Sequence, residues 1–324
     1  MKKLFWIISV MFLLQACTTV QSVYFERLQP ADVNFPAQIR SVGVVNNMPP
    51  VHQDYKDVDY TSASLEGDGD IAAENLAQEV VSVDYFDQVV LYDKRIRKSA
   101  YPLEQPIPKE TVDELIRLLD VDMLLSMERV NVVLKDSTMF IPELYTFVPA
   151  VEGVVTSVVR AYLKQQEKPL FTIQKMDTLC WEIVPELTFG DMVKDFSEYA
   201  ASMPMQYLLP YWKEEDRRYF DGGNVNMRDA GVCVRGQNWE EAYRLWKELY
   251  ETKKGKAKMR AAYNLAVYYE LQNDFVRAKE CLATAQALAS EDSWEMQLIL
   301  LYQLQLEEQT RRNQRLNVQM KRFE

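Results

Sequence analysis

Residues able to do covalent or proton-transfer chemistry are scarce in this chain of 324 residues, which has one histidine and four cysteines. The histidine, His52, lies in a segment that follows Pro49 and Pro50. A Ser-His-Asp or Cys-His mechanism would have to use it, and one histidine cannot build a histidine cluster for a metal. We therefore interpret His52 as an exposed loop residue, and we expect no catalytic triad and no metal site.

Carboxylates are abundant, with 48 acidic residues against 37 basic ones and a net charge of −11. Two carboxylates on either side of a glycosidic bond could hydrolyse it, so a cell-envelope carbohydrate hydrolase is one alternative. No spacing singles out such a pair. The acidic balance disfavours nucleic acid as a partner, and no glycine-rich phosphate loop follows the first predicted strand. We expect a non-enzymatic protein without a cofactor.

Three of the cysteines, Cys180, Cys233 and Cys281, have apolar neighbours and no C-x-x-C spacing. This pattern argues against a structural zinc site or a thioredoxin-like redox centre. We expect each thiol to behave as a small buried apolar group. A disulfide between Cys233 and Cys281 in an oxidising compartment stays open as an alternative.

The fourth cysteine, Cys17, ends a segment typical of a signal peptide. Lys2 and Lys3 precede the apolar run Leu4–Leu14, which is too short to span a hydrocarbon core of roughly 30 Å. Leu14-Gln15-Ala16-Cys17 then resembles a bacterial lipobox. The resemblance implies that residues 1–16 are a signal peptide and that Cys17 is acylated, for example with palmitate. Several acyl chains on one residue anchor a protein durably.

The residues after Cys17 bear on where such a lipoprotein would be sorted. Thr18 stands where an aspartate would signal retention in the inner membrane, and no acidic run follows. By resemblance to known sorting rules, we expect an outer-membrane lipoprotein that faces the periplasm. Residues 17–37 are interpreted as a polar, lipidated tether.

Residues 38–187 alternate between strand and helix patterns and predict a compact α/β domain. The expected order is strand, helix, strand, helix and three strands, a mixed α+β or α/β fold. This order is similar to that of small domains in periplasmic accessory lipoproteins, such as the activators of penicillin-binding proteins and the curli secretion lipoprotein. The expected elements are strand 39–45, helix 71–83, strand 88–92, a helix opened by Pro108 and a Thr111–Glu114 capping box, and strands 121–135, 151–163 and 170–184.

Two further segments join the predicted elements. The polar segment 51–70 predicts a long loop, which with nearby aromatic side chains could bind a small ligand. Asp68 and Asp70 at its end are interpreted as a helix start. Residues 188–236 predict a helical connector rich in aromatic residues, whose rings we expect to pack between two domains.

The C-terminal segment 237–324 carries a pattern of small and large apolar residues that recurs after about one helix pair. Its members are Asn264, Leu265, Ala266, Tyr269, Ala278, Leu282 and Ala285, with Asn238, Ala242, Trp246 and Leu249 one unit upstream. This pattern resembles the tetratricopeptide repeat (TPR) family, whose repeats have about 34 residues and whose small residues let two antiparallel helices approach closely. The resemblance implies an all-α module that binds peptides or proteins in a groove lined by its first helices.

Carried over by position, Arg260, Tyr263, Val267 and Glu270 would line that groove. Packing of these helices against the α/β domain is the alternative. Asp136-Ser137-Thr138, expected at a turn, and Asp177-Thr178-Leu179 resemble the O-glycosylation pattern of Bacteroidetes, which implies sugars on Ser137 and Thr178.

Together these features resemble an uncharacterised family of Bacteroidetes outer-membrane lipoproteins, with an α/β domain followed by TPR-like repeats. We expect a periplasm-facing scaffold or accessory factor, attached to the membrane by its lipid, that contacts a periplasmic protein partner. The carbohydrate hydrolase and the small-ligand binder stay as alternatives.

Overall fold

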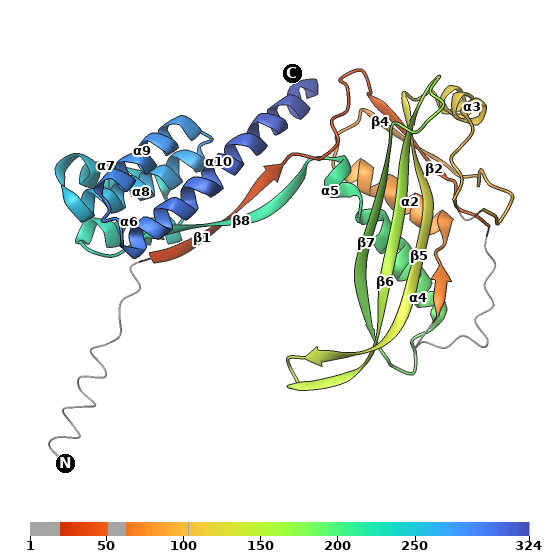
Figure 1. The fold of residues 1–324 in the computed structure, drawn as a ribbon, viewed down its shortest axis with the longest axis horizontal. Coiled ribbons are helices and arrows are strands. Elements are labelled where there is room, and N and C mark those ends of the chain that lie inside the picture. Colours follow the sequence, from red (N-terminus) through yellow and green to blue (C-terminus); the bar gives the residue numbers. More distant parts are fainter. Residues whose placement is uncertain (1–19, 51–62, 103, 324) are drawn as a thin grey trace, which may run out of the picture. The chain divides into compact units, whose positions relative to one another are not determined.

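A computed structural model of the chain describes residues 20–50, 63–102 and 104–323, and it divides into two compact units (Figure 1). The helical unit comprises the described residues 20–29 together with 212–317. The α/β unit comprises the described residues of 30–211 together with 318–323. Cys17, His52 and residues 51–62 of the predicted ligand loop lie outside the described residues.

The α/β unit is built on a mixed sheet in the order β4-β2-β5-β6-β7, with the short strand β3 paired to β5. Strands β4, β2 and β5 run parallel, and β5, β6 and β7 form two successive antiparallel hairpins. The strands are β2 (Ser41–Asn46), β3 (Ser64–Glu66), β4 (Gln88–Tyr92), β5 (Met123–Ile141), β6 (Thr146–Leu163) and β7 (Phe171–Glu182).

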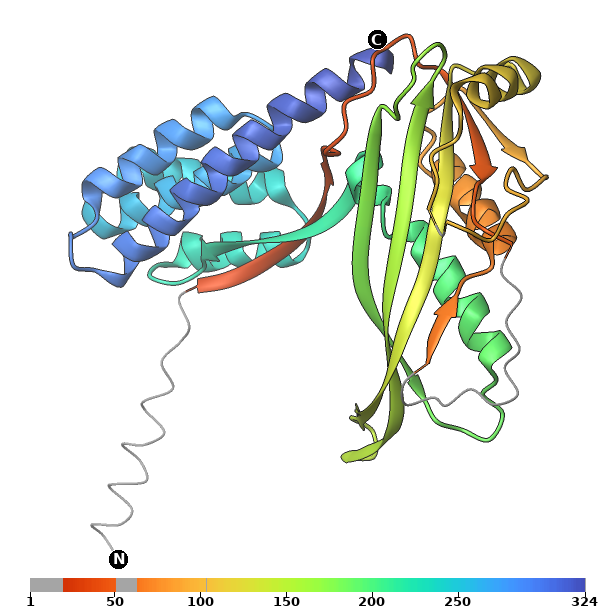
Figure 2. The ribbon, with the colours of Figure 1, turned by 45° about the vertical axis from the view of Figure 1, so that its right-hand side comes forward.

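Helices cover both faces of this sheet. Helices α2 (Gly69–Ser82) and α4 (Phe189–Ser202) lie on one side, followed by the short α5 (Met205–Leu208) (Figure 2). Helix α3 (Lys109–Leu119) packs a smaller apolar cluster on the other side. Of the four residues that helical spacing places on one apolar face, Ala72, Leu76 and Val80 are buried in α2, whereas Val83 follows the helix and is exposed. Burying one such aliphatic side chain contributes about 1.5–3 kcal/mol.

The C-terminal part of the chain is helical. Helices that follow one another pack side by side, from α6 through α9. A two-stranded sheet of β1 and β8 completes the helical unit. Its elements are β1 (Val20–Gln29), β8 (Tyr211–Phe220), α6 (Val225–Arg235), α7 (Trp239–Thr252), α8 (Gly255–Leu271), α9 (Phe275–Leu288) and α10 (Trp294–Met320). The 3-10 helix η1 (Lys321–Phe323), which follows α10, belongs to the α/β unit. The prediction of an N-terminal α/β region followed by a helical region is confirmed at this level.

The interpretation of residues 17–37 as a tether is wrong for residues 20–29, which form β1. Strand β1 pairs with β8, and β8 occupies residues that were expected to be a helical connector. The remainder of the connector divides between α4 and α5 of the α/β unit and α6 of the helical unit. The strand β8 reads Tyr-Trp-Lys-Glu-Glu-Asp-Arg-Arg-Tyr-Phe, and charged residues conceal its apolar alternation.

The expected extent of the C-terminal helical module also differs from the structure. Residues 318–323 belong to the α/β unit, although 237–324 was expected to be one module. The amide of Gln319 donates to the carbonyls of Ala31 and Val33 at 3.0 and 2.9 Å, and the ring of Phe323 packs edge-on against Tyr85. Contacts made by two single residues such as these leave no periodic pattern in the sequence.

Two local predictions are also wrong. Asp136-Ser137-Thr138 lies within β5 and not at a turn, because β5 and β6 remain paired as far as Ile141 and Thr146. The capping box expected at Thr111 is absent from α3. Pro108 occupies the N-cap position and makes no side-chain capping bond. By contrast, Asp68 caps α2 as predicted, accepting hydrogen bonds from two backbone N–H groups.

Candidate functional site

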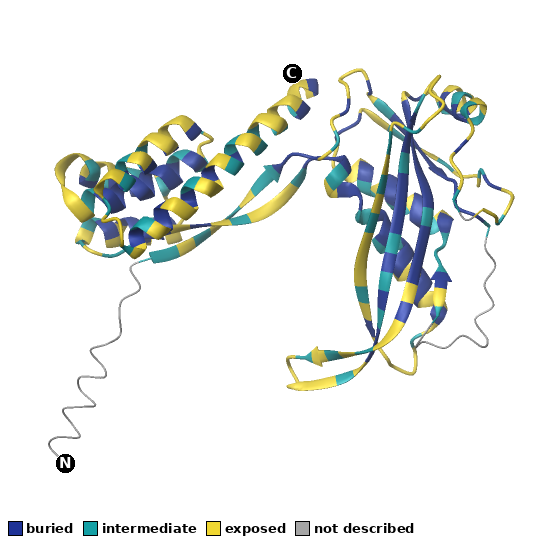
Figure 3. Ribbon diagram, viewed as in Figure 1, coloured by how far each residue is buried: buried dark blue, intermediate teal, exposed yellow. Residues whose placement is uncertain are grey.

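The four residues expected to line a TPR groove all lie on α8, and the structure buries all of them. Arg260, Tyr263, Val267 and Glu270 have exposed fractions of 8%, 2%, 0% and 0%. In Figure 3 most of α8 is dark blue, the colour of buried residues. The groove expected from the repeat resemblance is therefore filled from within the helical unit itself.

Charged residues of β1 and β8 fill the space beside Glu270. The guanidinium of Arg217 donates two hydrogen bonds to its carboxylate, at 2.9 and 2.7 Å. The hydroxyl of Tyr302 on α10 donates a third at 2.7 Å, and Arg27 lies 3.5 Å away. Burial raises the pKa of Tyr302 well above its ordinary value, so that this hydroxyl stays protonated as a donor.

Aromatic rings and one further cation fill the other end of the same surface. The ring of Tyr263 packs against Phe220 and Tyr302, with centroids 5.1 and 5.2 Å apart. Arg260 donates to the carbonyl of Gly222 at 3.0 Å and to Glu295 at 3.4 Å. These internal contacts occupy the side chains that were expected to bind a peptide in the TPR groove.

A second buried polar cluster, which sequence reasoning missed, surrounds Glu128 in the α/β unit. Its side chain is fully buried and accepts hydrogen bonds from Asn47 at 2.7 Å, Tyr162 at 2.8 Å and Arg160 at 3.1 Å. Burial raises the pKa of Glu128 above its ordinary value. The position of Glu128 inside the apolar run of β5 was the feature of the sequence that could have indicated this cluster.

The Glu128 cluster lies at the carboxyl end of β2, where its parallel pairing with β5 stops, and the carboxyl ends of parallel strands are a common position for binding sites in α/β sheets. Arg160 also binds Glu104 at 3.2 Å, and Arg129 lies 3.6 Å from Glu104. Guanidinium groups thus separate these carboxylates, so they do not form the exposed pair that glycoside hydrolysis needs. With Glu128 fully buried, the cluster is suited to joining β2, β5 and β6.

An exposed apolar surface lies at the far end of the β5–β6 hairpin. Among the described residues, β5 beyond Leu134 is hydrogen-bonded only to β6, and the last bond from the chain after β7 to β6 runs from the Ile183 N–H to the Pro149 carbonyl at 3.1 Å. Residues 136–148 therefore form a two-stranded projection, which we call the arm (Figure 1). A two-stranded hairpin has no core of its own and is marginally stable alone.

The arm carries aromatic and aliphatic side chains that are exposed in the described part of the chain. Phe140, Leu144, Tyr145 and Phe147 have exposed fractions of 44%, 69%, 89% and 67%. Phe140 and Phe147 are cross-strand partners with ring centroids 5.2 Å apart, and the ring of Tyr145 lies 6.5 Å from Phe140. Figure 3 shows the tip of the arm largely in yellow, the colour of exposed residues. Clustered exposed apolar side chains of this kind mark interaction sites in soluble domains.

The remaining predicted site residues are separate from this surface or at its base. Ser137 lies on β5 with its hydroxyl 3.5 Å from Glu152, and Thr178 is exposed on β7. The thiols of Cys180, Cys233 and Cys281 are free, so the Cys233–Cys281 disulfide is not formed in this structure, and Cys180 is exposed. Within the described part of the chain, no group of metal-ligating side chains comes together, and no helix is both long and apolar enough to cross a bilayer.

Comparison with known proteins returns two families without an assigned function. Residues 39–220 match the family model described as "Domain of unknown function (DUF8603)", and residues 228–308 match "Domain of unknown function (DUF6340)". No curated protein matches the chain.

Among solved structures, a PelC dodecamer from Paraburkholderia phytofirmans and a point variant of it are similar to the chain at 11% and 12% identity. The likeness covers 57% and 58% of this chain and 99% of each PelC chain, with TM-scores of 0.26 and 0.28. Scores this low carry no argument about this protein.

Proposed function

We propose that this chain, which belongs to the family of the domain of unknown function DUF8603, is a non-enzymatic lipoprotein that binds another protein through the arm. The exposed cluster of Phe140, Tyr145 and Phe147 is the observation that carries the proposal. Aromatic side chains supply large contact areas at a low cost in conformational entropy, and they dominate the binding energy of many interfaces.

The proposed location follows from the residues before β1. The lipobox-like Leu14–Cys17 segment supports acylation of Cys17 and attachment to the periplasmic face of the outer membrane. The first described residue of β1, Val20, follows closely in the sequence. The mature protein would thus begin its folded part almost at its lipid.

We also propose that α6 to α9 are two TPR-like helix pairs, α6–α7 and α8–α9. The small residues Ala242 and Ala278 are fully buried, as the close crossing of such helices requires. Because β8 and α10 cover α8, these pairs serve as a scaffold in this proposal. Partner binding is assigned to the arm.

Site-specific photo-crosslinking in cells tests the proposal. A benzophenone amino acid replaces Tyr145 in one strain and Lys194 in another. Lys194 is the matched control, because its side chain is 61% exposed on α4 of the same unit. We expect a discrete protein adduct from position 145 and none from position 194. The same adducts from both positions, or none from position 145, would contradict the proposal.

A further inference from the structure

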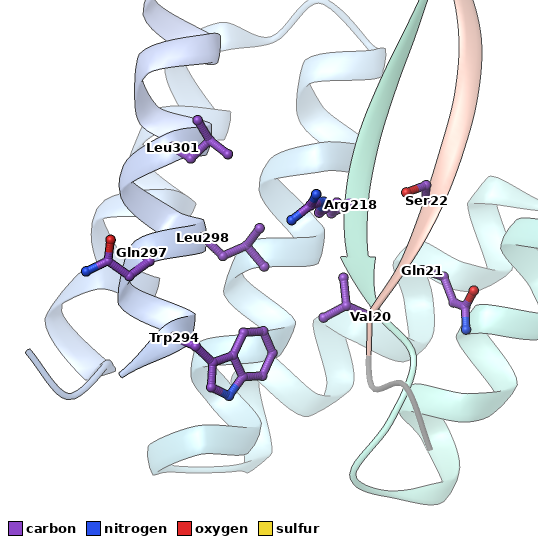
Figure 4. Close-up of a pocket in the computed structure, with 8 residues that line it drawn as sticks. All are labelled: Val20, Gln21, Ser22, Arg218, Trp294, Gln297, Leu298 and Leu301. Carbon is purple, nitrogen blue, oxygen red and sulfur yellow. The ribbon is translucent and has the colours of Figure 1, made fainter. Parts of the chain in front are cut away.

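A groove of about 670 Å³ lies between the start of β1, strand β8 and the first turns of α10 (Figure 4). The side chains of Val20 and Leu298 point into the space between the strands and the helix. Trp294 and Leu301 flank Leu298 on α10, and Arg218 of β8 faces them. All of these residues belong to the helical unit.

The helix side of this groove is apolar yet remains open. Trp294 and Leu301 are each 49% exposed, and Leu304, one turn beyond Leu301, is 66% exposed. Residues 294, 298 and 301 recur at helical spacing and so share one face of α10. The indole of Trp294 rests partly on the ring of Phe220, with centroids 5.8 Å apart, which fixes it at the edge of the groove.

The sequence places the predicted anchor beside this groove. Cys17 is three residues before Val20, which lines the groove. Three residues of fully extended chain span at most about 11 Å. If acyl chains on Cys17 are inserted in a bilayer, Val20, at one end of the groove, must therefore lie within about that distance of Cys17.

We propose that this face of the helical unit lies against the phospholipid surface that holds Cys17. Trp294 and Leu301 occupy the membrane interface, where tryptophan is enriched. The guanidinium of Arg218 binds headgroup phosphate. The attraction is mainly apolar, as the acidic composition of the chain requires. This inference rests on the proposed acylation of Cys17, and it adds an orientation to that anchor.

Photo-crosslinking to lipid tests the inference with the mature, full-length protein. The benzophenone amino acid replaces Leu301 in one sample and Val276 in the other. The protein is reconstituted into vesicles of phosphatidylethanolamine and phosphatidylglycerol that carry a labelled phospholipid. Val276 is the matched control, since it is 69% exposed on α9 of the same unit. Flotation of the vesicles reports attachment separately, and circular dichroism reports folding.

We expect the protein to float with the vesicles and to form a phospholipid adduct from position 301 but not from position 276. Flotation without an adduct at position 301, or with equal adducts at both positions, overturns the inference while leaving the lipid anchor intact. A protein that does not float overturns the anchor and this inference with it.

Discussion

The face of α8 and the arm are both rich in aromatic side chains, but among the residues that the structure describes only the face of α8 is covered by other parts of the chain. Tyr263 on α8 is 2% exposed beneath β8 and α10, whereas Tyr145 on the arm is 89% exposed. The repeat resemblance predicts partner binding at the face of α8, whereas solvent exposure indicates partner binding at the arm. A motif that binds partners elsewhere is available for binding only where the surrounding chain leaves it open.

The physical reason for this difference is what each surface can be packed against. Helix α8 lies among α7, α9, α10 and β8, so its side chains can be buried, and even Glu270 is neutralised there by Arg217. The arm is a single layer of two strands, and no second layer of described residues packs on its side chains. Apolar side chains kept in such a place need a partner to become buried.

The largest effect is expected from removing the charge of Glu270. The change Glu270→Gln removes the fully buried carboxylate that pairs with Arg217 and Arg27 and leaves Glu215 as their remaining ion-pair partner among the described residues. Breaking a buried pair in this way costs about 3–5 kcal/mol. We expect the free energy of unfolding to fall by that amount in urea titrations followed by circular dichroism. Glu248→Gln, at an exposed position on α7, is the control. Equal, small effects of both changes would show that α8 is not a closed surface.

A smaller loss is expected at Gly153, on the covered part of the strand that also forms the arm. A Cβ atom there would lie 2.5 Å from Cγ2 of Val132 and 2.7 Å from Cζ3 of Trp181. Gly153→Ala should therefore destabilise the protein by about 1–3 kcal/mol, the usual cost of overpacking a core. Gly190→Ala is the control, because its nearest neighbour would be 3.6 Å away. A thermal unfolding midpoint unchanged by Gly153→Ala would contradict the packing described for β6.

The buried Glu128 cluster of the α/β unit should make the free energy of unfolding depend on pH. Because burial raises the folded-state pKa of Glu128, the folded protein binds its proton more tightly than the unfolded chain. The resulting stabilisation is complete below the unfolded pKa and is lost as pH rises through the folded pKa, with a slope of at most about 1.4 kcal/mol per pH unit for one proton. Glu128→Gln removes this loss. Urea titrations from acid to neutral pH should show wild type losing stability relative to the variant, and parallel curves would contradict the expectation.

The smallest effect on stability is expected on the arm. Tyr145→Ser and Phe147→Ser remove exposed side chains, and surface changes of this kind usually alter the free energy of unfolding by less than about 0.5 kcal/mol. Urea titration of each variant measures this directly. A loss comparable to that of Gly153→Ala would mean that the arm is a structural element packed in place and not a free surface.

Much of the fold was predictable from periodicity. The strand Gln88–Tyr92 and the apolar face of α2 followed from simple patterns, and the β5–β6–β7 hairpins followed from apolar runs separated by polar turns. The helix cap at Asp68 was predictable because the interaction is local. Features set by neighbouring residues in the sequence were accessible in this way.

Features set by residues distant in the sequence were not accessible. Strand β8 was hidden because its inward-facing residues include Arg217, whose partner Glu270 comes much later in the chain. The Glu128 cluster likewise joins Glu128 of β5 to Asn47, which follows β2, and to Arg160 and Tyr162 of β6. The arm was missed because the predicted strand 121–135 ends too early and the predicted strand 151–163 begins too late. The residues between them continue the same pairing, with exposed apolar side chains.

The most direct test of the central claim is the affinity of the protein trapped at position 145 for the purified mature chain and for its Tyr145→Ala, Phe147→Ala variant. Loss of aromatic side chains central to an interface costs at least about 2 kcal/mol, which corresponds to roughly a 30-fold rise in Kd. We predict a rise of that size or more with an unchanged unfolding midpoint, while Lys194→Ala leaves Kd as it was. An unchanged Kd for the arm variant would contradict the assignment of partner binding to the arm.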